Sequence, residues 1–314
     1  MLTAYIDHHG RLEKLADPTA PGALRRAVWI DVVEPTDEER EIMSRLLPWQ
    51  LPAEDDLEEI EASSRSFADE HGLHISSWFL RRLEGRDETV NAAFRLTPTQ
   101  LFTMHDPEVP VLRLMRMRAN RGALPVAPRA LLRALYETKL DELADTLEEI
   151  HESLDEYGQD ALQRRSRDFA DAAAQLTEIE HLNSKVRLCL VDAQRDLTFL
   201  LRHGGLDKAE RRQWQTLLRD IDSLLPHCEF LFEKVTFLLH ALQGFVNIEQ
   251  NQIIKIFSVV AVIFLPPTLI ASSYGMNFHI MPELDWPFGY PMAIVMMILS
   301  GIAPYLLFKR KGWL

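Results

Sequence analysis

Two long stretches without a charged residue, near the C-terminal end of the sequence, constrain the fold most. Residues 256–278 form one run of 23 residues, and residues 288–308 form a second of 21. As helices they would be about 34 and 31 Å long, which matches a hydrocarbon core of about 30 Å. Aromatic residues flank the second run, as is typical of membrane interfaces. We predict two membrane spans. The alternative is a buried helical hairpin in a large soluble core.

Charge is distributed unevenly along the 314 residues. Of the 34 basic and 47 acidic residues, only four basic and two acidic ones follow residue 250, so the first 250 residues carry a balance of −15 and the rest +2. Such an acidic chain is a poor binder of nucleic acid, because affinity for the backbone rests on Lys and Arg displacing counterions. We therefore expect no nucleic-acid partner, and we expect the lipid bilayer to be the partner of the C-terminal runs.

The basic residues around the two runs predict an orientation. Lys255 precedes the first run, Lys309, Arg310 and Lys311 follow the second, and residues 279–287 contain none. By the positive-inside rule, both termini lie in the cytoplasm and the short loop lies outside. Charges interrupt the first fifteen residues, so no signal peptide is expected there.

The sequence ahead of the spans changes character near residue 128. Before it, alternation predicts strands at Leu2–Ile6, Ala27–Val33, Leu73–Leu80, Thr89–Leu96 and Leu101–His105. After it, helical periodicity dominates. We predict six segments: a cytosolic α+β domain (1–127), long cytosolic helices including a stalk (128–250), the stalk end and first span (251–278), an outer loop (279–287), the second span (288–308) and a basic cytosolic tail (309–314).

Helix-capping and helix-breaking residues predict the helix boundaries. Thr36 and Glu39 form a capping box that opens a helix, and Asp207 with Glu210 caps another. Gly158 is expected to break the first long helix and Gly204 to end the second. From Asp207 the helical spacing continues into the first span. A helix of about 60 residues would be roughly 90 Å long, too long for one globular domain, so we interpret it as a stalk.

A short motif at the end of the first span points to a family. Residues 274–277 read Tyr-Gly-Met-Asn, residues 281–284 read Met-Pro-Glu-Leu, and a second span and a basic end follow. This pattern resembles the CorA family of magnesium transporters, and in overall plan the resemblance covers the whole chain. It implies a funnel-shaped homopentamer in a bacterial inner membrane, with the stalk helix continuing as the pore-lining span.

The resemblance also implies roles for individual residues. The selectivity filter would consist of Tyr274, Gly275, Met276 and Asn277; the pore lining would include Ser272, Thr268 and Asn251; and Leu265 and Phe257 would form hydrophobic gates. For the two gate positions, helix packing or lipid contact remains an alternative. For Gly275 to Asn277, a helix C-cap followed by a turn is the alternative.

Physical chemistry makes such a site reasonable. A two-span hairpin encloses no pore, so conduction needs a ring of subunits, which turns one Asn277 into a ring of amides. Mg²⁺ loses its water reluctantly, and amide oxygens can bind the hydrated ion without a fixed charge. We expect Gly275 to allow a sharp turn and Thr268 to bond a carbonyl freed by the neighbouring prolines. Glu283 and Asp285 would attract cations to the outer loop, or form a solvated loop with no binding role.

These observations lead to one functional hypothesis with two alternatives. No phosphate-binding glycine loop occurs, so we expect no nucleotide partner and no enzyme activity. The chain would carry Mg²⁺, with Co²⁺ and Ni²⁺ as further candidates, into the cell down the membrane potential, and cytosolic Mg²⁺ bound between subunits would close it. Which acidic residues form that regulatory metal site stays open. The alternatives are a zinc transporter of the same superfamily, with or without proton coupling, and a non-conducting membrane-anchored sensor or scaffold.

Overall fold

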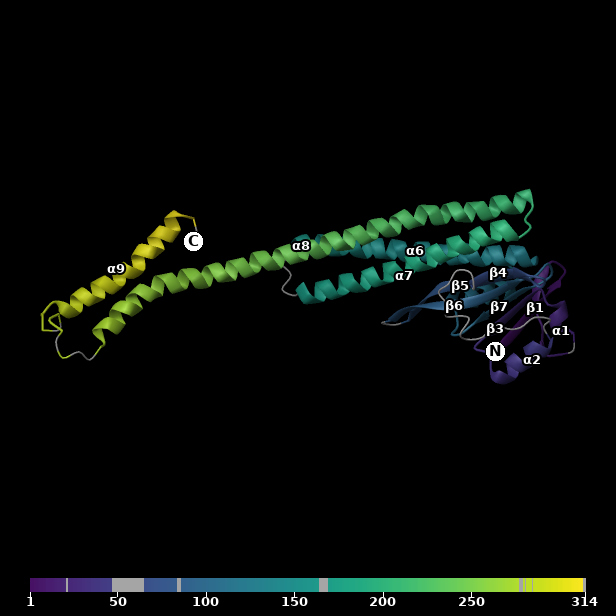
Figure 1. The fold of residues 1–314 in the computed structure, drawn as a ribbon, viewed down its shortest axis with the longest axis horizontal. Helices are drawn as coiled ribbons and strands as arrows, with labels where there is room; N and C mark the ends of the chain where they lie inside the picture. Colours follow the sequence, from purple (N-terminus) through teal and green to yellow (C-terminus); the bar gives the residue numbers. More distant parts are fainter. Residues whose placement is uncertain are drawn as a thin grey trace. The chain divides into compact units, whose positions relative to one another are not determined.

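Figure 1 shows the fold as a computed structural model, which describes residues 1–20, 22–46, 65–83, 86–163, 169–276, 279, 281–283 and 285–312. The chain divides into two compact units, Met1–Leu239 and His240–Leu314. The finer boundaries predicted above stay predictions. The elements are β1 (Leu2–His8), β2 (Arg11–Lys14), α1 (Ala23–Arg26), β3 (Trp29–Val33), α2 (Asp37–Leu46), β4 (Ser66–Asp69), β5 (Gly72–Leu83), β6 (Arg86–Leu96), β7 (Leu101–His105), α5 (Pro110–Asn120), α6 (Pro128–Gln163), α7 (Phe169–His203), α8 (Lys208–Tyr274) and α9 (Gly289–Arg310).

The strands of the described residues form one seven-stranded sheet in the order β2-β1-β3-β7-β6-β5-β4. Its central pair, β3 and β7, is parallel, with Ile30 opposite Phe102. The other neighbouring strands are antiparallel. All five strands predicted from alternation are present, which confirms an α+β part ahead of the long helices. The sequence analysis missed β2 and β4, which have four residues each.

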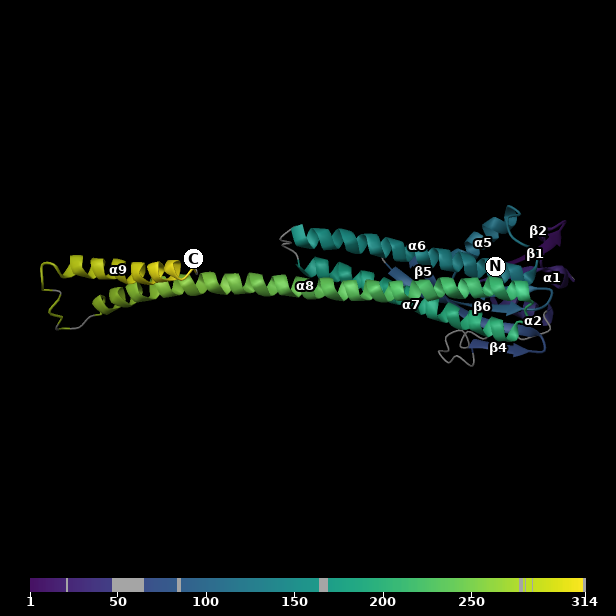
Figure 2. The same ribbon diagram turned by 90° about the horizontal axis from the view of Figure 1, so that it is seen from above.

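Helices cover both faces of the sheet: α1 and α2 lie on one side, and α6 and α7 lie along the other (Figures 1 and 2). Alternation along β3 explains this layering, because successive side chains point to opposite faces. Ile30 and Val32 belong to a core cluster with Leu24 of α1 and Met43 of α2. Asp31 points the other way, towards Arg116 of α5.

Most of the predicted helix boundaries are confirmed. The Thr36 backbone N–H donates to Glu39 Oε2 at 3.1 Å, and the Glu39 N–H donates to Thr36 Oγ1 at 3.2 Å, which completes the capping box. Asp207 Oδ1 accepts the N–H of Glu210 at 2.7 Å at the start of α8. The break expected at Gly158 was wrong, because α6 continues to Gln163. One helical glycine costs only about 1 kcal/mol, which the buried leucine stripe of α6 outweighs.

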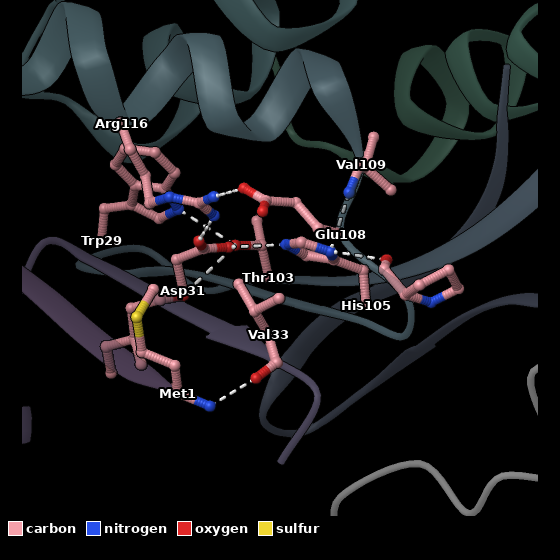
Figure 3. Close-up of polar contacts among 11 residues, drawn as sticks. Met1, Trp29, Asp31, Val33, Thr103, His105, Glu108, Val109 and Arg116 are labelled. Atoms are coloured by element: carbon pink, nitrogen blue, oxygen red, sulfur yellow. Dashed lines mark hydrogen bonds and ion pairs between the residues drawn. The ribbon is translucent and has the colours of Figure 1, made fainter. Parts of the chain in front are cut away.

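A buried polar network joins the middle of the sheet to α5 (Figure 3). The Asp31 carboxylate is fully buried and accepts hydrogen bonds from Arg116 and from the Thr103 hydroxyl. Its Oδ1 lies 3.5 Å from Nε2 of His105, while the Trp29 indole donates to Thr103 Oγ1 at 3.1 Å. Burial by itself would raise the pKa of Asp31, but the contacts with His105, Arg116 and Thr103 lower it below its ordinary value.

In the second unit, two glycines of α9 allow close backbone approach. A Cβ on Gly301 would lie 3.4 Å from Cγ of Pro267 and 3.6 Å from the carbonyl oxygen of Ile263, both in α8. A Cβ on Gly289 would lie 2.0 Å from the carbonyl oxygen of Glu283. The first position therefore has room for a methyl group, and the second has none.

Replacing Asp31 with Asn should destabilise the protein in a pH-dependent way. The folded-state pKa lies below the unfolded-state value of about 4, so the carboxylate stabilises the fold above that pH and ceases to do so as pH falls through the folded-state pKa. The variant also leaves the Arg116 guanidinium without its buried counter-charge. Breaking a buried pair costs about 3–5 kcal/mol, so we expect the melting temperature at pH 7 to fall by roughly 10 °C.

Thermal unfolding of the detergent-solubilised full chain, followed by tryptophan fluorescence between pH 7 and pH 3, measures this effect. The difference from wild type should shrink as the solution becomes acidic. Glu41→Gln, which removes an exposed partner of Arg45, is the matched control and should change little. Identical melting of Asp31→Asn and wild type at pH 7 would contradict the prediction.

The two α9 glycines predict opposite outcomes for the same substitution. Gly289→Ala should destabilise the protein by about 1–3 kcal/mol, because the methyl group overlaps backbone that cannot move aside without distortion. Gly301→Ala should be nearly neutral, because its methyl group makes an ordinary contact with Pro267. Thermal melting of both variants in detergent compares them directly, and an equal effect of the two substitutions would show that these contacts do not govern the hairpin.

Candidate functional site

Two helices are long and apolar enough to cross a membrane: α8, which contains the first predicted span, and α9, which contains the second. Only 6% of the most apolar window of each is buried. This exposure disfavours the alternative of a buried hairpin in a soluble core, since such a core would cover these windows. A single chain therefore presents a large apolar surface that water does not favour.

The last part of α8 has two opposite faces. One face, which contains Val259, Ile263 and Pro267, is partly or fully covered and lies against α9. The other face is exposed. Phe257 and Leu265 expose 69% and 65% of their surfaces.

The sequence-predicted residues map onto these faces with one exception. At 3.6 residues per turn, Phe257, Leu265, Thr268 and Ser272 fall within an arc of about 80° that points away from α9. All four are exposed. Asn251 is also exposed but lies roughly 80° from the centre of that arc, so an ideal helix does not bring it into the same row.

The double proline in α8 leaves two backbone carbonyls without their helical donors. Pro266 and Pro267 lack N–H groups, so the carbonyls of Val262 and Ile263 lose their i+4 partners. The expectation that Thr268 replaces one of them was wrong. Its hydroxyl donates instead to the carbonyl of Phe264, at 2.7 Å, because that carbonyl lies one turn below it.

The first two residues of the Gly-Met-Asn motif complete the last turn of α8. The Gly275 N–H donates to the Ala271 carbonyl at 3.0 Å, and the Met276 N–H donates to the Ser273 carbonyl at 3.4 Å. Gly275 lies in a turn at the end of α8, as expected, and it makes this turn without adopting the left-handed conformation. Met276 is half exposed. Asn277 lies outside the described residues, and its role stays a prediction.

The described part of the loop between α8 and α9 has exposed carboxylates next to aromatic rings. Glu283 and Asp285 are both exposed. Trp286 and Phe288 contact each other edge to face, with ring centroids 5.9 Å apart. The Gly289 N–H donates to the Trp286 carbonyl at 2.9 Å and opens α9. Exposed acidic groups at this position are compatible with both alternatives given above.

The described residues contain no group of three or more His, Cys, Asp or Glu side chains placed to hold a metal ion. The structure instead shows a buried charge cluster that sequence reasoning missed. Asp192 of α7 pairs with Arg65 at 2.8 Å and accepts the Trp78 N–H at 2.6 Å. Asp196, one turn on, accepts from Tyr136 at 2.9 Å, and burial together with Asp192 raises its pKa. Residues so distant in sequence give no local signal.

Another missed group is Glu142 of α6. Burial raises the pKa of Glu142 to about 7, although the charge of Arg82 acts in the opposite direction. Arg82, the basic neighbour of Glu142, also donates a hydrogen bond to Glu149, and the charge of Asp145 adds to the rise of the Glu142 pKa. No regulatory metal site can be assigned from these described residues.

Comparisons with known proteins agree with the motif. Residues 25–310 match the profile of a family described as "CorA-like Mg2+ transporter protein". The chain is 49% identical over 319 aligned residues to "Magnesium transport protein CorA" of Salmonella typhimurium, with both chains covered completely. In fold it is similar to the CorA magnesium transporter structure from Methanocaldococcus jannaschii, with a TM-score of 0.80, 20% identity and coverage of 100% and 99%.

A second solved structure is a more distant match. The ZntB cytoplasmic domain from Vibrio parahaemolyticus has a TM-score of 0.55 and 13% identity, and it covers 77% of this chain and 96% of its own. That likeness concerns the fold alone. The profile match spans most of the chain and the near-half identity spans all of it, so the chain belongs to the CorA-like Mg²⁺ transporter family.

Proposed function

We propose that this chain is the subunit of a ring-shaped channel that carries Mg²⁺ into the cell down the membrane potential. One observation carries the proposal: α8 keeps Phe257, Leu265, Thr268 and Ser272 together on the face opposite α9. A ring of subunits would bring those faces around one axis, so the exposed apolar and hydroxyl side chains would line a passage. The 49% identical relatives bear the name of magnesium transport proteins.

Thr268 suits a hydrated cation. Its hydroxyl proton is committed to the Phe264 carbonyl, so the lone pairs of the oxygen face outward as acceptors. The waters around Mg²⁺ point their hydrogens outward and need acceptors, and Mg²⁺ keeps most of those waters. Asn277 would offer amide oxygens at the outer mouth in the same way, with Glu283 and Asp285 attracting dications from outside. Leu265 and Phe257 would close the pore by dewetting.

The driving force needs no nucleotide. Moving two charges through 100 mV provides about 4.6 kcal/mol, enough for roughly a thousandfold accumulation. The finer assignments belong to this proposal: a homopentamer in an inner membrane, cytoplasmic termini, transport of Co²⁺ and Ni²⁺ beside Mg²⁺, and closure by cytosolic Mg²⁺ between subunits. Zinc transport is the second candidate within the superfamily. The 49% identical relatives are named magnesium transport proteins, which favours Mg²⁺.

Uptake of Mg²⁺ into liposomes that contain the purified protein tests the function. With an inside-negative K⁺ diffusion potential, we expect influx that follows the potential, and Asn277→Ala should reduce it because the amide ring is lost. Zn²⁺ and a pH gradient are tested in parallel. Zn²⁺ uptake that requires the pH gradient, without Mg²⁺ uptake, would identify a zinc transporter. Absence of flux for every ion, also in Mg²⁺-free internal buffer, would favour the sensor or scaffold.

The hydroxyl of Thr268 provides a sharper test inside the pore. Thr268→Val keeps the shape but removes the acceptor oxygen, and losing a hydrogen bond to a charged group costs about tenfold or more, so Mg²⁺ flux should fall by about that factor. Thr268→Ser retains the oxygen and is the matched control, with flux close to wild type. A Val variant that conducts as well as the Ser variant would exclude Thr268 from the ion path.

A further inference from the structure

A groove between α7 and α8 of the first unit has the chemistry of an anion site. Its cavity volume is about 480 Å³. We call it the arginine groove, and the lining residues that matter below are Arg195, Thr198, Arg202, Ser66, Gln194 and Asp222. We infer that the arginine groove binds a phosphate-rich anion, meaning a triphosphate chain either free or as part of a nucleotide.

The positions along α7 place both arginines over the same groove. Arg195, Thr198 and Arg202 follow the spacing i, i+3, i+7, which keeps side chains on one helix face. The two arginines are about 10 Å apart along the helix axis. An anion with several linked phosphates can contact both, whereas a single small anion reaches only one.

The charges of the arginine groove are unbalanced in an otherwise acidic chain. The formal net charge of the protein is −13, yet neither Arg195 nor Arg202 forms an ion pair within the part of the chain that the structure describes. Among the described residues the groove is lined by one carboxylate, Asp222, which accepts a hydrogen bond from Gln194 and keeps its charge, so the two arginines exceed it by one positive charge. A guanidinium group can donate two parallel hydrogen bonds to phosphate oxygens. Two guanidinium groups without an ion pair among the described residues therefore favour a phosphate ligand.

A buried hydroxyl at the edge of the groove also lacks a partner. Ser66 Oγ is covered, and the described residues offer it no hydrogen bond. Leaving such a group unsatisfied costs about 1–3 kcal/mol. Phe199, which stands between the two arginines in sequence, also lines the cavity, and its ring lies against that of His203 with the ring centroids 4.6 Å apart. A nucleobase would join this pair of rings.

If the chain transports Mg²⁺, as proposed above, binding of a triphosphate would report how much Mg²⁺ the cell contains, and this step rests on that function. Triphosphates bind Mg²⁺ through their oxygens, which reduces their negative charge. Free triphosphate therefore becomes more abundant as Mg²⁺ becomes scarce, and it is the form that two arginines attract more strongly. The arginine groove would be occupied when the cell lacks the transported ion. The glycine-rich phosphate loop missing from the sequence belongs to nucleotide hydrolysis and is not needed for this contact.

Calorimetric titration of the detergent-solubilised full chain with sodium triphosphate, in Mg²⁺-free buffer, tests the inference without measuring transport. We expect saturable binding to wild type, and Arg195→Gln and Arg202→Gln should each weaken it about tenfold. Arg187→Gln removes an exposed arginine from the same helix outside the groove and should leave binding unchanged. Adding Mg²⁺ should weaken the apparent affinity. The melting temperature of each variant confirms that it is folded.

The remaining outcomes decide the inference. Equal binding of triphosphate and adenosine triphosphate would show that the phosphate chain is recognised, and tighter binding of the nucleotide would show that Phe199 adds a base contact. Either result supports the site. Absence of binding at millimolar triphosphate, or equal weakening by Arg187→Gln, would overturn it, since the second result means diffuse attraction without a site. Liposome flux can fail or succeed independently of these results.

Discussion

The packing of α9 against one face of α8 organises the membrane part of this protein. Ile263 and Pro267 lie against α9, and the side chains on the opposite face stay exposed among the residues that the structure describes. Lipid can cover the apolar members of that face, but it cannot hydrogen-bond Ser272 or the free lone pairs of Thr268. A face that carries both apolar and hydroxyl side chains therefore has a lower free energy beside a water-filled space than against lipid.

The first unit contains buried charges, and each of the two discussed here is paired with a charge of opposite sign. Asp31 and Asp192 are both buried, and each is matched with an arginine from a distant part of the chain, Arg116 and Arg65. These pairs tie the sheet to α5 and to α7. Because breaking such a pair leaves an uncompensated charge, the pairs specify how the layers meet more than they add to stability.

The parts of the fold that depend on local pattern were predictable, and the parts that depend on distant contacts were not. The strand from Leu101 to His105 and the cap at Thr36 have clear local signals and were predicted correctly. β2 buries only Leu12, and β4 is a largely exposed edge strand, so neither shows the alternation that marks a half-buried strand. Gly158 was misjudged because tertiary packing outweighed propensity. The motif around Gly275 indicated the family, but the Asp192 cluster joins residues 127 positions apart and could not be seen.

The missing hydrogen bonds at Pro266 and Pro267 have a mechanical consequence. The free carbonyl of Ile263 lies on the side of α8 that faces α9, as the short approach of Gly301 to it shows. On the opposite side the helical ladder continues without interruption, so α8 is compliant on one side and stiff on the other. Bending at this point would lengthen or shorten the α9 side while preserving the spacing from Phe257 to Ser272. The C-terminal end of α8 can thus bend towards or away from α9 while the exposed row from Phe257 to Ser272 keeps its spacing.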